Sequence, residues 1–168
     1  MTTKNSDCLN RAIKLLASRP HSTKELEKKL ATRGFAENDI HAALEWLSQR
    51  GYLNDGEFGI IYAKSRVARA RVGSARLKMD LRAKGLDGGV VDSALASVFG
   101  NDGAELAVAL DSAKRKARSL APGVGDEVAR KKIFDHLVRK GFSAELARQV
   151  VFEKFRDIMG DKIIRDDA

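Results

Sequence analysis

A pattern of hydrophobic residues around a central glycine occurs three times in this sequence. Gly34, Gly85 and Gly141 each follow a leucine or isoleucine by eight residues, a leucine by four and a basic residue by one, and each precedes an apolar residue. Apolar residues three or four positions apart lie on one face of an α-helix. A glycine after such a run is typical of a helix end, because glycine enters the left-handed conformation without steric cost. The register recurs about every 50 residues and predicts tandem helical repeats.

Each repeat is predicted to contain three helices. The helix breakers Pro20, Gly73 and Pro122 fall at the same place, between the first and second helices of their repeats. Asn-Asp-Gly opens both the second and the third repeat. The predicted boundaries are residues 1–53 for the first repeat, 54–100 for the second, and 101–168 for the third with a C-terminal tail. Since a single repeat is too small to bury its apolar face well, stacking of neighbouring repeats is expected to supply the stability.

The register also predicts structural roles for particular residues. Gly34, Gly85 and Gly141 are expected to end helices, and Gly73 to set the angle between the two helices beside it. Ser22 and Glu25 have the spacing of a capping box at the start of a helix. The first helix is expected to begin near Ser6 or Asp7 and to bury one face. The residues of that face are Leu9, Ala12, Ile13 and Leu16. The core positions of the repeat register are Leu26, Leu30, Leu77, Leu81, Ile133 and Leu137.

The composition agrees with an all-α fold. Aromatic residues make up 6% of the chain and proline occurs twice, a composition that favours helices over sheets. The single Cys8 excludes an intrachain disulfide framework and is typical of a reducing compartment. No apolar run approaches the ~20 residues of a membrane span, and the N-terminus lacks the hydrophobic segment of a signal peptide. We expect a soluble, cytoplasmic protein.

The basic segment Lys64–Leu86 of the middle repeat holds eight lysine or arginine residues and one acid. The chain as a whole has 31 basic and 23 acidic residues, and this net charge of +8 favours a polyanionic partner. Within the segment the apolar periodicity weakens where the charge density rises, which indicates a binding face. The predicted binding residues come from this segment and from two basic clusters of the third repeat: Lys64, Arg66, Arg69, Arg71, Arg76, Lys78, Arg82, Lys114, Arg115, Lys116, Arg118, Arg130, Lys131 and Lys132.

Patterns of catalytic or cofactor-binding residues are absent from the sequence. His21, His41 and His136 lie far apart in unrelated positions of the repeats, and with Cys8 they do not match the spacing of zinc ligands. The sequence contains no P-loop, glycine-rich nucleotide fingerprint or nucleophile elbow. We therefore interpret the chain as a binding protein without metal, cofactor or enzymatic activity.

Several motifs resemble those of a known family. They are Leu15-Leu16-Ala17 and Arg33-Gly34-Phe35 in the first repeat, and Tyr52-Leu53-Asn54-Asp55-Gly56-Glu57-Phe58, Tyr62-Ala63-Lys64-Ser65-Arg66, Arg76-Leu77 and Leu81-Arg82-Ala83-Lys84-Gly85 in the second. With these motifs the sequence is similar to the RecX regulators of the bacterial recombinase RecA. The resemblance extends from about Leu9 to Phe155.

The resemblance implies an elongated, curved array of three-helix repeats that lies in the groove of the RecA–single-stranded DNA filament. Such a protein suppresses filament extension, ATP hydrolysis, strand exchange and coprotease activity, and so modulates recombination and the SOS response. We expect a monomer, and direct contact with DNA stays open. So does the role of Arg66, either a contact residue or a structural bridge.

The alternative is a helix-turn-helix-like regulator that acts on DNA directly, with the third helix of a repeat in the major groove. The third helices, at residues 36–49, 88–98 and 144–155, carry little basic charge. Charge concentrated on first and second helices suits contact with phosphate or protein better than the reading of bases. Simultaneous reversal of Arg69, Arg71 and Arg76 is expected to abolish the inhibition of RecA with little change in stability.

Overall fold

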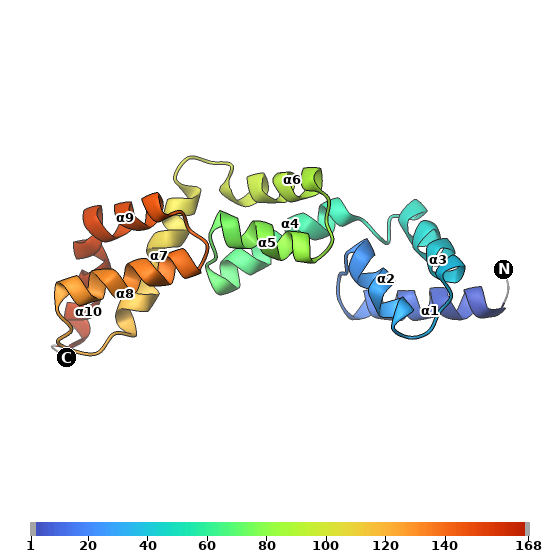
Figure 1. The fold of residues 1–168 in the computed structure, drawn as a ribbon, viewed down its shortest axis with the longest axis horizontal. Coiled ribbons are helices and arrows are strands. Elements are labelled where there is room, and N and C mark those ends of the chain that lie inside the picture. The colour runs from blue at the N-terminus through green and yellow to red at the C-terminus, as the bar shows by residue number, and fades with distance from the viewer. Residues whose placement is uncertain (1–2, 167–168) are drawn as a thin grey trace. The chain divides into compact units, whose positions relative to one another are not determined.

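The computed structural model describes the backbone of residues 3–166 and the side chains of residues 6–160, and all regular structure in this part of the chain is helical. Figure 1 labels the helices in chain order. Their bounds are α1 (Thr3–Ser18), α2 (Thr23–Ala31), α3 (Glu37–Gln49), α4 (Asp55–Ala70), α5 (Ser74–Ala83), α6 (Gly88–Phe99), α7 (Ala104–Arg118), α8 (Asp126–Arg139), α9 (Ala144–Glu153) and α10 (Phe155–Asp166).

The contacts of the chain divide it into two compact units. The first unit comprises Met1–Tyr62 and Asp80–Ala94, and the second comprises Ala63–Met79 and Leu95–Ala168. Helices α4 and α5 therefore supply residues to both units. This division by contacts differs from the division into sequence repeats, because the middle repeat is shared between the two units.

In the first unit, α1, α2 and α3 enclose a small apolar core. Leu26 and Leu30 of α2 are fully buried, as the repeat register predicts. The expectation for α1 is wrong in two respects: the helix begins at Thr3, and Ile13 is 42% exposed. Ala12 is fully buried as expected, and so is Cys8, which lies four positions earlier on the same helix face.

Half of the predicted capping box at the start of α2 is confirmed. The Ser22 hydroxyl accepts a 3.1 Å hydrogen bond from the backbone N–H of Glu25. The carboxylate of Glu25 does not return to the Ser22 backbone, as a capping box would require. It binds Arg19 and Lys84 instead, because a charged donor forms a stronger hydrogen bond with a carboxylate than a backbone amide does.

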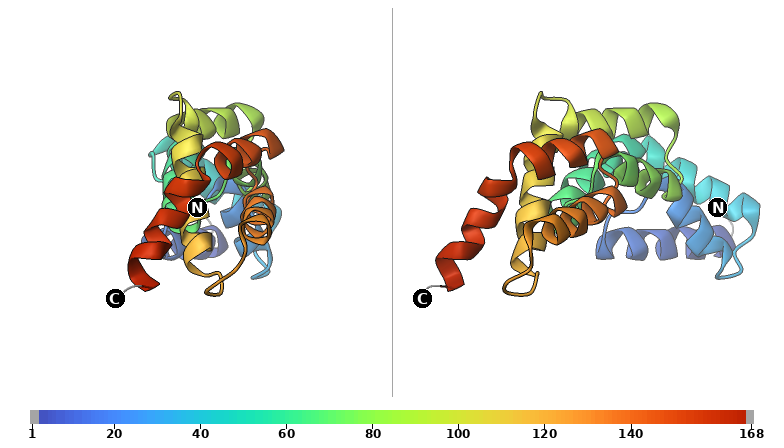
Figure 2. Two further views of the ribbon diagram at one scale, coloured as in Figure 1. Left: turned by 90° about the vertical axis from the view of Figure 1, so that its left-hand side faces the viewer. Right: turned by 60° about the vertical axis from the view of Figure 1, so that its left-hand side comes forward.

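The second unit has a larger apolar core, formed by α7, α8, α9 and α10. Ile133 and Leu137 of α8 are fully buried in it, which confirms two further positions of the register. Figure 2 shows α10, at the red end of the chain, following α9. The sequence analysis did not predict α10 within the third repeat and its C-terminal tail, and Phe155 and Ile158 of this helix are buried in the core. Of the last residues, 167 and 168 lie outside the described part.

The glycines after the second helices have the left-handed conformation expected of helix ends, and Gly73 lies in the turn between α4 and α5. Gly34, Gly85 and Gly141 have φ values of +82°, +80° and +88°. Gly73 does not have a positive φ. A Cβ atom at Gly73 would lie 2.5 Å from the carbonyl oxygen of Gly141. Glycine is thus needed at residue 73 because another part of the backbone comes close. The residue near this turn with a left-handed conformation is Arg71, at φ +50°.

Candidate functional site

Two equivalent packing contacts occur in the molecule, one in each unit. In the first unit, the end of α5 packs against the start of α2, and we call this contact the first junction. The Ser22 hydroxyl donates a 2.6 Å hydrogen bond to the carbonyl oxygen of Lys84. The backbone N–H of Thr23, the first residue of α2, donates to Asp55 Oδ1 at 2.7 Å. The negative charge of Asp55 at this position also interacts favourably with the positive end of the helix dipole of α2.

In the second unit, the end of α8 packs against the start of α5, and we call this contact the second junction. Gly73 N–H donates to the Lys140 carbonyl oxygen at 2.9 Å, and Ala75 N–H to that of Gly141 at 3.2 Å. Ser74, the first residue of α5, donates its backbone N–H to Glu105 Oε1 at 2.7 Å. The two junctions therefore share one design, in which an acid from a nearby helix caps the second helix of a repeat.

The charged side chains at the first junction are paired with one another. Lys84 Nζ lies 3.2 Å from Glu25 Oε1, and the guanidinium of Arg19 binds both oxygens of the same carboxylate, at 2.7 and 3.1 Å. The hydrogen bond from Arg19, followed by that from Lys84, lowers the pKa of Glu25 to about 2. The two cations and the carboxylate thus form a compact ion cluster that is closed within the first unit.

The second junction has a cation where the first has its carboxylate. Arg76 precedes Gly85 by nine residues, as Glu25 precedes Gly34. Lys140, the counterpart of Lys84, donates from Nζ to the carbonyl oxygen of Ala70 at the end of α4. A cation at this position interacts favourably with the negative end of the helix dipole.

The electrostatic environment of Lys140 shows how positive this junction is. Burial lowers the pKa of Lys140, and so do the charges of Arg66, Arg115, Arg71 and Arg76, in that order. These arginines come from α4, α7, the turn after α4, and α5. We call the five residues Arg66, Arg71, Arg76, Arg115 and Lys140 the basic junction. It brings cations from five separate parts of the second unit near one another.

Within the basic junction, Arg71 also has a structural role. Its guanidinium forms an ion pair with Asp111 of α7, and its left-handed backbone ends α4. A carboxylate in place of Arg71 would face that of Asp111. We therefore withdraw the expectation that reversal of Arg71 leaves the stability almost unchanged.

The structure places the other predicted residues of the second unit outside this cluster or at its margin. Lys64 and Arg69 are exposed on α4, and Lys116 of α7 lies close enough to His136 to lower its pKa. Burial is the largest cause of that shift, and together with Lys140, Lys116 and Arg139 it brings the pKa of His136 to about 4. The remaining residues are Lys78, which is half-buried on α5, Lys114, half-buried on α7, and Arg118, exposed at the end of α7.

The cluster predicted on α8 divides into three different environments. The guanidinium of Arg130 lies 3.8 Å from the ring centroid of Phe155 and donates to the Val151 carbonyl oxygen, so it takes part in internal packing. Lys131 forms a 3.0 Å ion pair with Asp135 one turn later, and Lys132 is exposed. Arg82 differs from all of these because it belongs to the first unit, where it is exposed on α5.

Lys140 is the residue of this site that the sequence analysis missed. It appeared there only as the basic residue that precedes Gly141 in the register. The sequence feature that could have indicated it is the adjacent Gly141, which packs closely against Arg76 and so places Lys140 beside the start of α5. The sequence does not show which helix Gly141 packs against.

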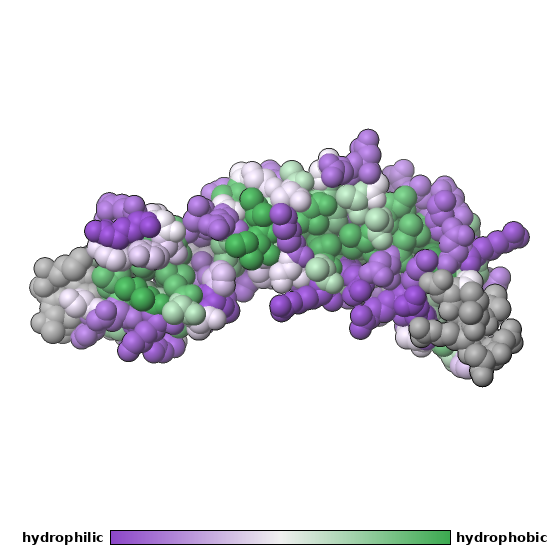
Figure 3. Space-filling view, turned by 180° about the vertical axis from the view of Figure 1, so that it is seen from behind, coloured by the Kyte–Doolittle hydropathy of each residue, from purple (hydrophilic) through white to green (hydrophobic). Residues whose placement is uncertain are grey.

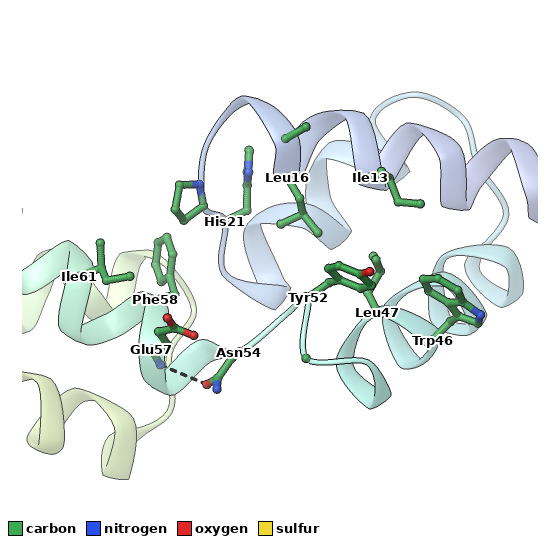
Figure 4. Close-up of a pocket in the computed structure, with 13 residues that line it drawn as sticks. Ile13, Leu16, His21, Trp46, Leu47, Tyr52, Asn54, Glu57, Phe58 and Ile61 are labelled. Atoms are coloured by element: carbon green, nitrogen blue, oxygen red, sulfur yellow. Dashed lines mark hydrogen bonds between the residues drawn. The ribbon is translucent and has the colours of Figure 1, made fainter.

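The first unit also contains an apolar groove of about 510 Å³. Figure 4 shows Trp46, Tyr52 and Leu47 on one side of it and Phe58 and Ile61 on the other. The rings of Trp46 and Tyr52 stack at 6.2 Å between centroids, so Trp46 packs within the first repeat. Figure 3 shows hydrophobic surface on the N-terminal part of this unit, at the left.

The polar groups of the groove serve the fold. Asn54 Oδ1 accepts from the backbone N–H of Glu57 at 3.1 Å and so caps α4. His21 is buried, and its Nδ1 donates to the carbonyl oxygen of Arg19 at 2.8 Å. Burial lowers the pKa of His21, which keeps the ring neutral. These groups lie in structural hydrogen bonds and do not form a catalytic arrangement.

Neither a metal site nor a membrane span is found in the part of the chain that the structure describes. No three histidine, cysteine, aspartate or glutamate residues are grouped there so that they could hold a metal ion. None of the helices in that part is both long enough and apolar enough to cross a bilayer. The positively charged basic junction is therefore our candidate site.

Comparison with known proteins now identifies the family. Models of the three three-helix domains of RecX match residues 8–47, 54–95 and 104–151 in that order, which together are more than half of the chain. The chain belongs to the RecX family. Its fold class is thereby confirmed as all-α with three tandem three-helix domains.

Full-length relatives agree with this assignment. The regulatory protein RecX of Halorhodospira halophila is 36% identical over 140 residues, which are 82% of this chain and 81% of that protein. The regulatory protein RecX of Amycolatopsis mediterranei is 30% identical over 154 residues, which are 92% and 86% of the two chains. The crystal structure of RecX from Lactobacillus salivarius has the same fold, with a TM-score of 0.77, 22% identity and coverage of 91% and 97%. RecX proteins are named as regulatory proteins, and this chain is a member of that regulatory family.

Proposed function

We propose that this RecX-family protein binds the filament that RecA forms on single-stranded DNA and inhibits RecA. Inhibition extends to filament growth, ATP hydrolysis, strand exchange and coprotease activity, so the protein modulates recombination and the SOS response in the cytoplasm. It acts by binding, as a monomer, without a cofactor or a catalytic residue.

The observation that carries this proposal is the convergence of Arg66, Arg71, Arg76 and Arg115 on Lys140 in the second unit. Burial lowers the pKa of Lys140, and the repulsion from these arginines lowers it further. An arrangement of this kind is stabilised when an anionic partner arrives. The guanidinium groups suit the carboxylates of a protein and the phosphates of DNA, since both accept two hydrogen bonds in one plane.

The other predicted cations of the second unit extend the proposed surface. Lys64 and Arg69 continue it along α4, and Arg118 lies at the end of α7. Arg130 is left out of the surface, because its guanidinium is engaged with Phe155 and Val151. Arg66 contributes to the charge around Lys140, which favours a contact role for it within the proposal.

The test is inhibition of the single-stranded-DNA-dependent ATPase of RecA by a variant with both Arg69→Glu and Arg76→Glu. Both side chains are exposed. We expect the half-inhibitory concentration to rise at least about tenfold, because each lost charged contact costs about 1–3 kcal/mol. Thermal unfolding should be almost unchanged.

The matched control reverses Arg148 and Arg156, which are exposed on α9 and α10 of the same unit. This variant has the same net charge as the test variant and should inhibit RecA normally. Equal inhibition by both variants would show that the site is assigned wrongly. Affinity for random single-stranded DNA across salt concentrations separates the alternative: a steep salt dependence without preference for the filament favours a protein that acts on DNA directly.

A further inference from the structure

A second concentration of positive charge occurs in the first unit, on α2 and the end of α5. These elements enclose a notch of about 260 Å³, which we call the basic notch. Five of its side chains are cationic and one is a carboxylate. The lining residues are Lys24, Glu25, Lys28, Lys29, Thr32, Arg33, Ala83 and Lys84. The binding residues predicted from the sequence do not include the lysines of α2, nor Arg33 just after this helix.

The helical spacing of α2 builds the notch. Lys24 and Lys28 are four residues apart, as are Lys29 and Arg33, so they form two neighbouring rows on the surface of α2 and just beyond its end. Leu26 and Leu30 of the same helix are fully buried. Lys24 and Lys28 lie on the side of α2 away from these leucines, whereas Lys29 lies between the two sides and is half-buried. Lys84, directly after α5, closes the side of the notch.

Lys24 is paired with Glu27 at 2.8 Å, but the carboxylate in the notch does not neutralise Lys28 or Lys29. Both oxygens of Glu25 are occupied by Arg19, and one of them also by Lys84. Among residues 6–160, whose side chains the structure describes, no carboxylate lies within ion-pair distance of Lys28 or Lys29. Two ammonium groups at the centre of the notch are thus without a counter-charge from the described protein.

We propose that the basic notch binds a phosphate group, and specifically the phosphodiester of a nucleic-acid strand. Ammonium groups bind phosphate as strongly hydrated point charges, and a group of them supplies donors from several directions. The opening suits a phosphate with its sugar. This site lies in the first unit and goes beyond the function proposed above, which uses cations of the second unit.

The first measurement locates the ligand. The full-length protein is titrated with tripolyphosphate, a mobile multivalent phosphate, while backbone amide signals are followed by nuclear magnetic resonance. We expect signals of residues 28–33 and 84 to shift, and the shifts to disappear in the variant with Lys28→Ala and Lys29→Ala. Unchanged signals in the wild type, or equal shifts in the variant, would overturn the proposal.

The second measurement identifies the source of the phosphate. Binding of a fluorescein-labelled oligothymidylate is measured by anisotropy between low and physiological salt. The variant with Lys28→Ala and Lys29→Ala should bind about tenfold more weakly, and the slope of log K against log salt should fall by about 1–2. If tripolyphosphate binding is lost but oligonucleotide binding is unchanged, the notch takes small phosphates and the phosphodiester assignment is wrong.

Matched variants keep this test independent of the proposed function. Lys14→Ala with Arg148→Ala also removes two exposed cations and should leave the amide shifts of the notch unchanged. The variant with Arg69→Glu and Arg76→Glu alters the second unit alone, so it should retain the notch shifts whatever its effect on RecA. Failure at one site is therefore distinguishable from failure at the other.

Discussion

The two junctions of this protein have the same backbone packing and opposite electrostatics. At each junction, a basic residue and a glycine at the end of the second helix of one repeat contact the start of the second helix of the repeat before it. An acidic side chain accepts a hydrogen bond from the first N–H of that earlier helix. The first junction places Glu25 beside Lys84, whereas the second places Arg76 near Lys140. At this position a carboxylate pairs with the basic residue in the first junction only.

The difference separates what holds the repeats together from what the surface presents. A hydrogen bond to the carbonyl oxygen of the basic residue, the capping acid and the close glycine are common to both junctions, so they belong to the architecture. The charge of the third residue of the helix differs between the junctions: this residue is Glu25 in α2 and Arg76 in α5. A basic cluster that lowers the pKa of its own lysine is a cost to folding, which is understandable if a bound anion removes that cost.

The largest expected effects concern the glycines that end the second helices. Alanine at residue 141 would adopt an unfavourable φ of +88° and place its Cβ 2.5 Å from the backbone nitrogen of Arg76. We expect Gly141→Ala to lower the free energy of unfolding by about 3 kcal/mol or more, since steric overlap adds to backbone strain. Chemical denaturation measures this difference.

The matched control is Gly34→Ala. Gly34 has a similar φ of +82°, but nothing lies within 4 Å of a Cβ built on it. This variant isolates the backbone term, and we expect a loss of about 1 kcal/mol. Gly85→Ala should fall between the two, because its Cβ meets the side chain of Lys24, with Cγ at 2.6 Å. Equal losses in all three variants would show that close packing at the junctions contributes nothing.

A smaller loss of stability is expected at the first junction. Glu25→Gln leaves Arg19 and Lys84 without their carboxylate and should lower the free energy of unfolding by about 1–3 kcal/mol. Fluorescence of Trp46, the single tryptophan, reports unfolding of the first unit. The control Glu27→Gln breaks an exposed pair with Lys24 and should cost at most about 0.5 kcal/mol. Similar losses in both variants would reduce the cluster at Glu25 to an ordinary surface pair.

The smallest effect concerns acid sensitivity, which should begin at higher pH in the second unit. The pKa of His136 is lowered from 6.5 to about 4, so the unfolded chain takes up the proton first and stability falls as the pH drops from about 6.5 to 4. Glu25, with its pKa lowered from 4.5 to about 2, loses its contribution only between about pH 4.5 and 2. Hydrogen exchange at pH 7 and pH 5 should show α8 amides losing about 1–2 kcal/mol of protection.

His136→Gln removes this titration and should make α8 protection independent of pH over that range. The control His41→Gln changes an exposed histidine of α3 and should leave the pH dependence intact. A pH dependence that survives in the His136 variant would assign the acid sensitivity to another group.

Much of the architecture could be predicted because it follows from local spacing. The buried leucines and the left-handed glycines each depend on residues a few positions away on one helix face, and they were correct. Gly73 was expected in the turn between two helices and lies there, but the sequence did not reveal that the backbone of residues 141 and 142 comes close to it. Helix α10 was missed since Phe155 and Ile158 form too short an apolar pattern, interrupted by Gly160.

The candidate site shows the same limit. The basic segment was visible in the sequence. Three of its arginines, Arg66, Arg71 and Arg76, lie near Lys140 together with Arg115. Lys140 itself was not selected, and the cations of α2 passed as an ordinary solvated helix face. A sequence records that a residue is charged but not which charges lie opposite it.

By itself, then, the sequence determined the repeat register, the helices, their core faces and the positive sign of the surface, since all of these depend on neighbours within a turn or two of helix. Tertiary structure alone decided which cations are paired and which are gathered together. Glu25 and Lys84 are 59 residues apart, and Lys140 is 70 residues from Ala70. Packing of the helices brings such groups within hydrogen-bonding distance, and only that packing places a carboxylate between the cations of one junction and gathers several cations at the other.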